Sequence, residues 1–253
     1  MKKIELEGAK NIRDFGGTMI GNRYRIKEDQ FIRSNSLAGI TEEDARKLED
    51  HYRLRKIIDL RTTQEVREKP DRKILGAKWM HLPLFDASQG GITHEKETDE
   101  NLPPLDDFIG FYTHMVTNPF SVSKLREVFG EITKQENGSV LWHCTEGKDR
   151  CGIVSALFLF LLGGDENTVM EDYLMTNQTA KKRAEDFYEK VLRETGNEKR
   201  AEFIRKVYVA DSSYLEGAID SMKKNYGSVD GFLREGLNIE ESSRISLQKR
   251  ILE

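Results

Sequence analysis

The feature that most constrains the fold is a continuous run in which an apolar strand, a polar loop and an apolar helix follow one another. Residues Ser139–His143 read Ser-Val-Leu-Trp-His, which predicts a short buried strand. Residues 144–151 form a polar loop with a central glycine, and the apolar run Gly152–Leu162 ends at a glycine pair, which predicts a buried helix. A strand that leads through such a loop into a helix N-terminus is a common architecture for binding phosphate.

The rest of the chain predicts strands mixed with helices in its first part and helices alone in its last part. Extended segments are predicted at Phe31–Arg33, Arg55–Leu60 and Lys78–Leu82, and helices at Thr41–His51, Leu105–Met115 and Val122–Gln135. After Asp165 the pattern is helical, with breaks near Thr195–Asn197, Ala210–Asp211, Tyr226–Gly227 and Leu237–Asn238. No linker or repeat divides the sequence, so we expect one domain over residues 1–253, of the α/β class with a helical C-terminal layer.

The composition excludes several classes of protein. The 253 residues carry 44 acidic and 40 basic side chains, a net charge of −4, which argues against a dedicated nucleic-acid binder. Only two cysteines occur, Cys144 and Cys151, which excludes a disulfide scaffold and a four-cysteine zinc site. The longest apolar run, Ile153–Leu162, is too short to cross a bilayer, and the N-terminus has no signal-peptide pattern. We therefore expect a cytoplasmic protein with no integral membrane segment, although secretion without a signal peptide stays open.

The polar loop has the residues needed to hold an anion. In a loop that curls at a helix N-terminus, free backbone N–H groups converge on one centre, and the helix dipole adds a positive potential. Gly147 allows the tight turn, Arg150 can grip two phosphate oxygens, and Lys148 adds a second, more mobile charge. The residues expected to bind phosphate, through backbone or side chain, are Thr145, Glu146, Gly147, Lys148 and Arg150. A nucleotide-binding P-loop is excluded, because Asp149 follows Gly147-Lys148 where that motif needs Ser or Thr.

The same positive field would give Cys144 a chemical role. The pKa of a cysteine thiol is typically about 8.5 and can fall to about 3.5–7.5 beside cations and a helix N-terminus, which yields the nucleophilic thiolate. Attack of that thiolate on phosphorus would give a phosphocysteine, which water then cleaves. The alternative is an ordinary buried cysteine, but Lys, Asp and Arg at an apolar junction would be costly without a ligand or partners. No histidine has metal-ligand spacing, so we expect no metal and no cofactor.

These residues resemble the signature of the protein tyrosine phosphatase superfamily, His-Cys-x5-Arg, here His143 to Arg150. The longer form, His-Cys-x-x-Gly-Lys-Asp-Arg-x-Gly, resembles the bacterial atypical, triple-specificity phosphatases. Further similar motifs lie in the expected order at Asn11–Gly17, Arg33–Leu37, Ile58–Arg61 with Glu65, and Asp172–Asn177. The resemblance implies a central, mostly parallel sheet flanked by helices.

The resemblance also implies roles for the loop residues. Cys144 is then the nucleophile, Arg150 the phosphate clamp, and Asp149 the acid that protonates the leaving oxygen. The alternative role of Asp149 is to hold Lys148 or Arg150 in place. His143 is expected to organise the loop by hydrogen bonding rather than to transfer protons.

Pairings are also expected around the loop. We expect Asp59, at the end of its strand, to orient Lys148, the alternative being a surface carboxylate. Arg61 and Glu65 are expected to form a structural ion pair, and Glu146 to be solvated.

Cys151 departs from the family pattern, in which Ser or Thr follows the arginine and donates a hydrogen bond to the nucleophile. A thiol is a weaker donor, so breakdown of the phosphocysteine could be slower. Two further interpretations stay open: a reversible disulfide with Cys144 under oxidation, and a small tolerated substitution.

The function implied is that of a cysteine-dependent phosphatase. Its substrates would be phosphotyrosine, with phosphoserine, phosphothreonine and phosphoinositides as further candidates, on a phosphorylated protein or a lipid. The charged helical stretch of about residues 178–209 resembles the lid of the family, although charged helices are usually solvated faces. The alternative function is a phosphate-binding module or slow pseudophosphatase. Arsenate reduction or sulfur transfer is disfavoured, because the spacing of Asp149 and Arg150 matches phosphoryl transfer.

Overall fold

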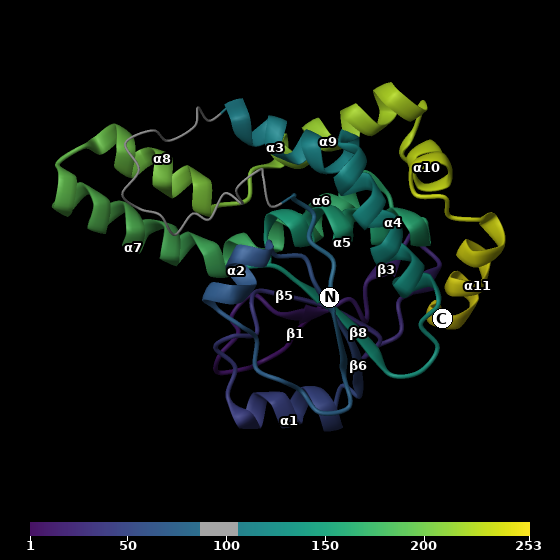
Figure 1. The fold of residues 1–253 in the computed structure, drawn as a ribbon. Helices are drawn as coiled ribbons and strands as arrows, with labels where there is room; N and C mark the ends of the chain where they lie inside the picture. The colour runs from purple at the N-terminus through teal and green to yellow at the C-terminus, as the bar shows by residue number, and fades with distance from the viewer. Residues whose placement is uncertain (87–105) are drawn as a thin grey trace.

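A six-stranded sheet forms the centre of the molecule in the computed structural model, which describes residues 1–86 and 106–253 (Figure 1). The strand order is β1-β2-β5-β8-β6-β7. The strands are β1 (Lys2–Lys3), β2 (Arg13–Asp14), β5 (Phe31–Ser34), β6 (Leu54–Asp59), β7 (Lys78–His81) and β8 (Ser139–His143). The pairings among β5, β8, β6 and β7 are parallel, and β1 and β2 add an antiparallel edge. The predicted fold class, a mostly parallel sheet flanked by helices, is confirmed.

Helices occupy most of the rest of the described chain. They are α1 (Glu42–Asp50), α2 (Thr63–Glu68), α3 (Asp106–Thr117), α4 (Pro119–Thr133), α5 (Asp149–Leu162), α6 (Glu166–Met175), α7 (Asn177–Thr195), α8 (Glu198–Tyr208), α9 (Ser212–Tyr226), α10 (Val229–Gly231), a π-helical turn η2 (Phe232–Gly236) and α11 (Glu241–Ile251). A short hairpin is formed by β3 (Met19–Ile20) and β4 (Tyr24–Arg25). The predicted start of a helix at Leu105 lies outside the described residues, and α2 was not predicted.

The sheet is covered on both faces. One face packs against α1, where Leu48 joins Ile32, Ile57 and Leu141 in a buried cluster. The other face is covered by α5 and by a helical layer that includes α3, α4, α6 and α9, as Figure 1 shows. The C-terminal half is helical, as predicted, with breaks at the expected positions and one further break at Thr176.

Strand β8 lies between two parallel neighbours, which explains its uninterrupted burial and its apolar sequence. In register, Ser34 of β5 and Asp59 of β6 lie opposite His143, the last residue of β8. The carboxyl ends of three parallel strands therefore meet at one edge of the sheet. In open α/β sheets this edge is where ligands bind.

Helix α5 is the buried helix predicted from the sequence, but it begins at Asp149 rather than at Gly152. Asp149 and Arg150 lie in its first turn, and because both are polar, the apolar pattern of the helix does not extend to them. The helix ends at Gly163, whose φ of 95° is the left-handed conformation that glycine adopts freely. Its side chains are buried nearly all round, because it is enclosed by the sheet and the helical layer.

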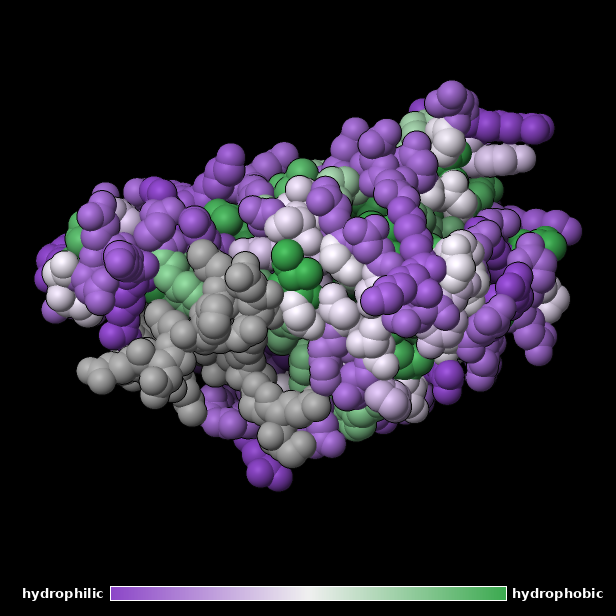
Figure 2. Space-filling view, turned by 90° about the horizontal axis from the view of Figure 1, so that it is seen from above, coloured by the Kyte–Doolittle hydropathy of each residue, from purple (hydrophilic) through white to green (hydrophobic). Residues whose placement is uncertain are grey.

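A view onto the helical layer shows a surface that is mostly hydrophilic, with hydrophobic side chains in scattered spots (Figure 2). This agrees with the content of charged residues, 33%, which is above the roughly 25% of an average domain. None of the helices in the described ranges is long and apolar enough to cross a membrane.

An aromatic cluster joins α5 to the sheet and gives a test of the core. The ring centroid of Phe158 lies 5.2 Å from that of Phe15, 4.7 Å from Phe31 and 5.3 Å from Trp142. Phe158→Ala should lower the free energy of unfolding by about 3–5 kcal/mol, because it leaves a cavity in a close-packed core. Urea unfolding measures the loss. Ile245→Ala, at an exposed position of α11, should change it by less than about 0.5 kcal/mol, and equal losses in the two variants would contradict this packing.

Candidate active site

The phosphate loop, defined here as residues 144–150, begins where β8 ends and runs into the first turn of α5. Gly147 has a φ of 68°, and a Cβ atom there would lie 2.7 Å from the carbonyl oxygen of Ser34 and 2.7 Å from the amide nitrogen of Asn35. Glycine is therefore required both for the turn and for the close approach of the loop to the end of β5.

The carbonyl groups of the phosphate loop are hydrogen bonded on its outer side. The side-chain amide of Asn11 donates to the carbonyl oxygens of Glu146, at 2.9 Å, and Gly147, at 3.2 Å. Arg33 Nη2 donates to the carbonyl oxygen of Gly147 at 2.7 Å and lies 3.4 Å from that of Lys148. Since the N–H and C=O of a peptide unit point in opposite directions, the N–H groups of these units face the other, inner side. This is the arrangement of an anion-binding nest.

Arg33 is held by a buried carboxylate. Asp172 of α6 accepts from Arg13 Nε at 2.9 Å and forms an ion pair with Arg33, and all three side chains are buried. Burial and the charge of Arg33 lower the pKa of Arg13, Asp172 raises it, and the net result is a pKa of about 10. Two cations on one anion leave a positive charge behind the loop. All three residues lie in the motifs quoted above, but the sequence spacing does not predict that their side chains meet.

Arg150 is fixed by Glu65 of α2. Its two terminal nitrogens lie 2.6 and 2.7 Å from the two carboxylate oxygens, a bidentate contact, and Thr145 also hydrogen bonds to the carboxylate. Burial raises the pKa of Glu65, but Arg150 more than offsets this and brings it to about 2. The expected pair between Arg61 and Glu65 is therefore wrong, because the capping turn of α2 directs Glu65 toward the loop. Arg150, which the sequence predicts as the phosphate clamp, is thus oriented within the site.

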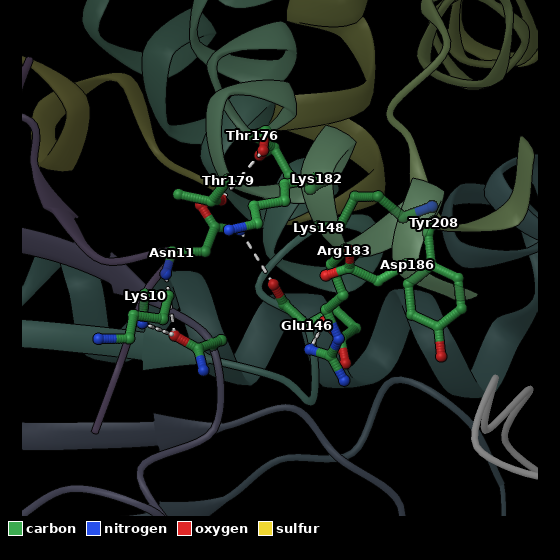
Figure 3. A pocket seen from close by; sticks show the side chains of 12 residues that line it. Lys10, Asn11, Glu146, Lys148, Thr176, Thr179, Lys182, Arg183, Asp186 and Tyr208 are labelled. Atoms are coloured by element: carbon green, nitrogen blue, oxygen red, sulfur yellow. Dashed lines mark hydrogen bonds and ion pairs between the residues drawn. The ribbon is translucent and has the colours of Figure 1, made fainter. Parts of the chain in front are cut away.

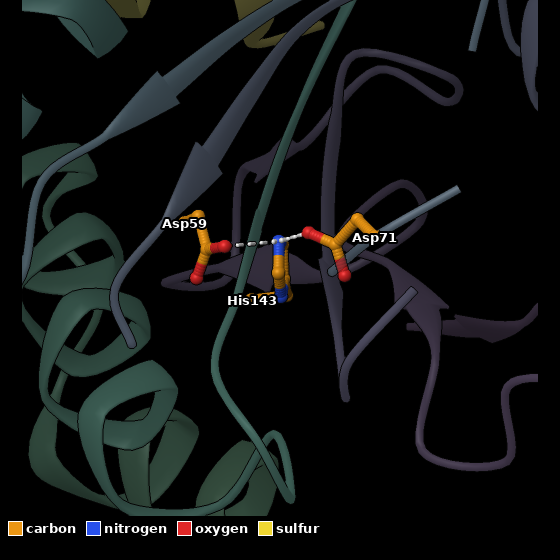
Figure 4. Close-up of side chains that lie close together, drawn as sticks. All are labelled: Asp59, Asp71 and His143. Atoms are coloured by element: carbon orange, nitrogen blue, oxygen red, sulfur yellow. Dashed lines mark ion pairs between the residues drawn. The ribbon is translucent and has the colours of Figure 1, made fainter. Parts of the chain in front are cut away.

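The partner expected for Asp59 is also wrong. Asp59 accepts from Arg61 Nη2 at 2.7 Å and lies 3.8 Å from His143 Nε2, which in turn is 3.0 Å from Asp71 (Figure 4). The bend after β6 turns the guanidinium of Arg61 back onto the end of its own strand, and it also pairs with Asp71 at 2.9 Å. Burial lowers the pKa of His143, but Asp59 and Asp71 raise it more, and the net direction is upward.

This cluster of Asp59, Asp71 and His143 has ligand atoms within 4.8 Å of one another, a spacing that could hold a metal ion. The guanidinium of Arg61 contacts both carboxylates and offsets one of their two negative charges. The arginine between the carboxylates suits a buried charge network rather than a cation site. His143, directly before Cys144, contacts this network through its ion pairs, but neither of its ring nitrogens makes a hydrogen bond among the described residues, so the expected organisation of the loop by hydrogen bonding stays a prediction.

Lys148 reaches away from Asp59, toward the end of α8. Its ammonium group donates to the carbonyl oxygens of Val207 at 2.6 Å and Val209 at 3.2 Å, and lies 3.1 Å from Asp149 Oδ1. The carbonyls at a helix C-terminus attract a cation, and Lys148 stands at the N-cap of α5, facing the helical layer. Lys148 therefore joins the phosphate loop to the C-terminal helices.

The two cysteines are both buried free thiols. Burial raises the pKa of Cys144, but the Cys151 thiol, the charge of Arg150 and the backbone N–H of Cys151 lower it to about 6. The pKa of Cys151 is well above its usual value because of burial and the neighbouring thiolate. Cys144 is therefore the thiolate, and Cys151 stays protonated beside it, with its sulfur also 3.5 Å from the carbonyl oxygen of Ser34, to which the thiol donates.

A second contact ties the loop to α7. The expectation that Glu146 is solvated holds only in part, because its side chain is 20% exposed and also forms an ion pair with Arg183 at 2.7 Å. The Arg183 guanidinium also lies 5.5 Å from the ring centroids of Phe187 and Tyr208. Glu146 and Arg183 line a cavity of about 240 Å³ beneath α7 and a second of about 360 Å³ beside Glu65 (Figure 3 shows the first). Two hollows thus flank the tip of the loop.

A cysteine thiolate at the start of a loop with inward N–H groups, beside an arginine held by a carboxylate, is the arrangement expected of a cysteine-dependent phosphatase. The chain belongs to the tyrosine phosphatase family, whose profile matches residues 4–253.

The similar proteins are bacterial, and each is 25% identical to this chain. A protein of Cupriavidus necator, whose name assigns it to the tyrosine-protein phosphatases, is matched over 94% of this chain and 85% of its own. A tyrosine-protein phosphatase of Nostoc commune is matched over 88% of this chain and 75% of its own length. The triple specificity protein phosphatase PtpB of Mycobacterium tuberculosis is matched over 91% and 92%.

The pKa of Cys144 can be measured by alkylation. Iodoacetamide should modify Cys144 with a rate that is half-maximal at about pH 6, because the thiolate is the reacting form. Cys151→Ala removes the thiol donor and should move the midpoint upward, whereas Cys151→Ser keeps a donor and should not. Peptide mass analysis follows the reaction. A wild-type midpoint near 8.5, the ordinary cysteine value, would contradict the thiolate.

The buried carboxylate behind the loop can be tested by stability. Asp172→Asn should cost about 3–5 kcal/mol of unfolding free energy at neutral pH, because it leaves two buried arginines without their anion. The pKa of Asp172 is lowered by these arginines, so its contribution is full above the unfolded-state pKa of about 3.9 and decreases below it.

Urea unfolding at several pH values measures the effect. The control is Glu166→Gln, at the start of the same helix α6, which breaks an exposed ion pair with Lys223 of α9 and should cost less than about 1 kcal/mol. A loss in Asp172→Asn no larger than in this control would show that the cluster does not hold the loop.

Proposed function

We propose that this protein hydrolyses phosphomonoesters through a phosphocysteine intermediate. The observation that carries the proposal is the thiol of Cys144, with a pKa of about 6, at the start of a loop whose peptide carbonyls are bonded on the outside. The thiolate attacks phosphorus while the bond to the leaving oxygen breaks, and water then cleaves the sulfur–phosphorus bond. The loop N–H groups and Arg150 stabilise the charge on the phosphoryl oxygens in both steps.

Asp149 is the proposed general acid. Its carboxyl is buried in the first turn of α5, close enough to raise the pKa of Cys144. It would give a proton to the leaving oxygen in the first step and take one from the attacking water in the second. The contact with Lys148 also supports the alternative role from the sequence, in which Asp149 holds that lysine.

Cys151 takes the place of the hydroxyl that usually supports the nucleophile. Its thiol is a weaker hydrogen-bond donor, so the thiolate is a poorer leaving group when the intermediate breaks down. We expect hydrolysis of the phosphocysteine to limit turnover.

The substrates proposed are phosphotyrosine, phosphoserine and phosphothreonine in proteins, and phosphoinositides. The name of the mycobacterial relative, a triple specificity phosphatase, supports a broad range. Inositol lipids carry several phosphates, which suits the cations around the loop, among them Lys10 and Lys182 beside the smaller cavity. Two free thiols suit a reducing compartment, and we place the protein in the cytoplasm.

The hairpin of α7 and α8, residues 177–208, is the proposed lid of a single domain. Its helices pack on one another through a small cluster that includes Ala184, Val191 and Ile204. Figure 1 shows it projecting to one side of the sheet, and its two links to the loop are the ion pair of Glu146 and the carbonyl contacts of Lys148. Release of these links would widen access to the loop.

The second candidate function is a phosphate-binding module or slow pseudophosphatase. The replacement by Cys151 favours it, because a slow second step would leave a phosphorylated protein that rarely turns over. The two functions differ in turnover and not in binding.

Hydrolysis of p-nitrophenyl phosphate separates them. The wild type should turn over many times, and Cys144→Ser should fall to background because serine is not ionised at neutral pH. Cys151→Ser is the matched control and should retain activity or gain it. Binding of phosphate by the wild type with no more than one product per chain would instead support the module.

A substrate panel then tests the range. Phosphotyrosine, phosphoserine and phosphothreonine peptides are compared with phosphoinositides in mixed vesicles, on wild type and Asp149→Asn. The activity of the variant should fall most on the phosphoserine peptide, because the serine alkoxide is a poor leaving group. Full activity of Asp149→Asn on that peptide would exclude the acid role.

A further inference from the structure

Two tyrosine hydroxyls lie in the core next to Asp149 and have no part in the steps above. Tyr112 of α3 donates to Asp149 Oδ1 at 2.5 Å, and its oxygen lies 2.7 Å from the hydroxyl of Tyr173 of α6. Both side chains are buried, with 0% and 1% of their surface exposed. Since Tyr112 donates its one proton to Asp149, the hydroxyl of Tyr173 must donate to Tyr112. The hydrogen bonds therefore run in one direction, from Tyr173 through Tyr112 to the carboxyl group.

Two cationic or hydroxyl donors contact the same oxygen of Asp149. The ammonium group of Lys148 is 3.1 Å from Oδ1, the atom that also accepts from Tyr112. In a protonated carboxyl group the oxygen without the proton is the stronger acceptor. Two donors on Oδ1 therefore leave the transferable proton to Oδ2.

The surrounding packing holds the tyrosine pair at this place. A Cβ atom at Gly152 would lie 3.1 Å from the ring of Tyr173, so the glycine lets that ring approach the first turn of α5. The ring centroids of Tyr112 and Tyr173 are 6.0 Å apart, in an edge-to-face arrangement. Burial raises the pKa of both tyrosines well above the usual value, so both remain hydrogen-bond donors at neutral pH.

A role in packing alone does not require the hydroxyls. Phenylalanine would fill the same volume, and a hydroxyl group in a core is costly unless it is hydrogen bonded. Tyr214 of α9 shows the contrast: its ring centroid lies 5.7 Å from that of Tyr112, yet among the described contacts it makes no hydrogen bond to Asp149. It is the matched control for the pair.

We propose that Tyr112, supported by Tyr173, is a positioning residue that presents Oδ2 of Asp149 to the leaving group. The inference rests on the proposed function. As the bond from sulfur to phosphorus forms and the bond from phosphorus to the leaving oxygen breaks, the proton on Oδ2 moves to that oxygen. The alcohol departs and a carboxylate remains. In the second step this carboxylate takes a proton from the attacking water, and the thiolate of Cys144 is released.

The dependence of the rate on the leaving group tests the inference. The rate of phosphocysteine formation is measured by rapid quench with 2,4-dinitrophenyl phosphate, which needs little acid assistance, and with phenyl phosphate, which needs much. In Tyr112→Phe the rate of phosphocysteine formation should fall roughly tenfold or more with phenyl phosphate and much less with the dinitrophenyl ester. The reason is that general acid catalysis contributes about 10²–10⁴-fold to the rate. Tyr173→Phe should show a smaller loss with the same selectivity. Tyr214→Phe should show no selectivity.

A double-mutant cycle completes the test. In an Asp149→Asn background, Tyr112→Phe should cause no further selective loss, because both changes act on one proton transfer. An equal loss on both esters, no loss, the same selectivity in Tyr214→Phe, or additive selective losses would each overturn the inference. The ratio of rates remains informative even where a variant is less stable, because both esters are measured on the same folded fraction. A wild type that forms no phosphocysteine with either ester would instead refute the proposed function.

Discussion

The buried guanidinium group of Arg33 is the interaction on which the rest of the site depends. It lies at the end of β5, is fully buried, and contacts the carbonyl oxygen of Gly147 on one side and Asp172 on the other. If the Gly147 carbonyl turned inward, a buried N–H group of Arg33 would lose its hydrogen-bond acceptor, which is unfavourable. The N–H groups of the loop are thereby directed to one centre before any ligand arrives. Such preorganisation is what makes backbone dipoles effective in catalysis.

Charge is concentrated around this loop in a chain whose net charge is −4. Arg13 and Arg33 share one carboxylate behind the loop, and Arg150 has one in Glu65 at its side. At the reacting atom, the Cys151 thiol and the charge of Arg150 lower the pKa of Cys144 to about 6 in spite of its burial. Buried ion pairs are weak evidence for stability, because desolvation offsets most of their attraction. Their value here is the fixed direction of dipoles and charges.

The sequence predicts most accurately the strands and helices whose apolar residues follow a clear pattern. Strand β8 was predicted to the residue, because an apolar run between two turns has one interpretation in a parallel sheet. The start of α5 was placed three residues late, at Gly152 rather than Asp149, because the polar first turn of a helix looks like loop. The fold class, and the proposal that Cys144 is the nucleophile, follow from this run together with the motif resemblance.

Side-chain pairings were the part that could not be predicted. Asp59 was assigned to Lys148 and Glu65 to Arg61, and the structure gives Asp59 to Arg61 and Glu65 to Arg150. Sequence spacing places these residues at one sheet edge but does not fix the direction of a bend after a strand or of a capping turn. The contact between Tyr112 and Asp149 joins two residues that are 37 positions apart on different helices, and no local sequence pattern predicts it.

Crystal structures of the Cys144→Ser protein, with and without phosphate, test the central claim most directly. A preorganised loop should have the same backbone in both, within about 0.5 Å, with the Gly147 carbonyl on Arg33 and the loop N–H groups directed at the phosphate. A loop that in the free protein turns the Gly147 carbonyl away from Arg33, and forms the nest only when phosphate binds, would contradict it.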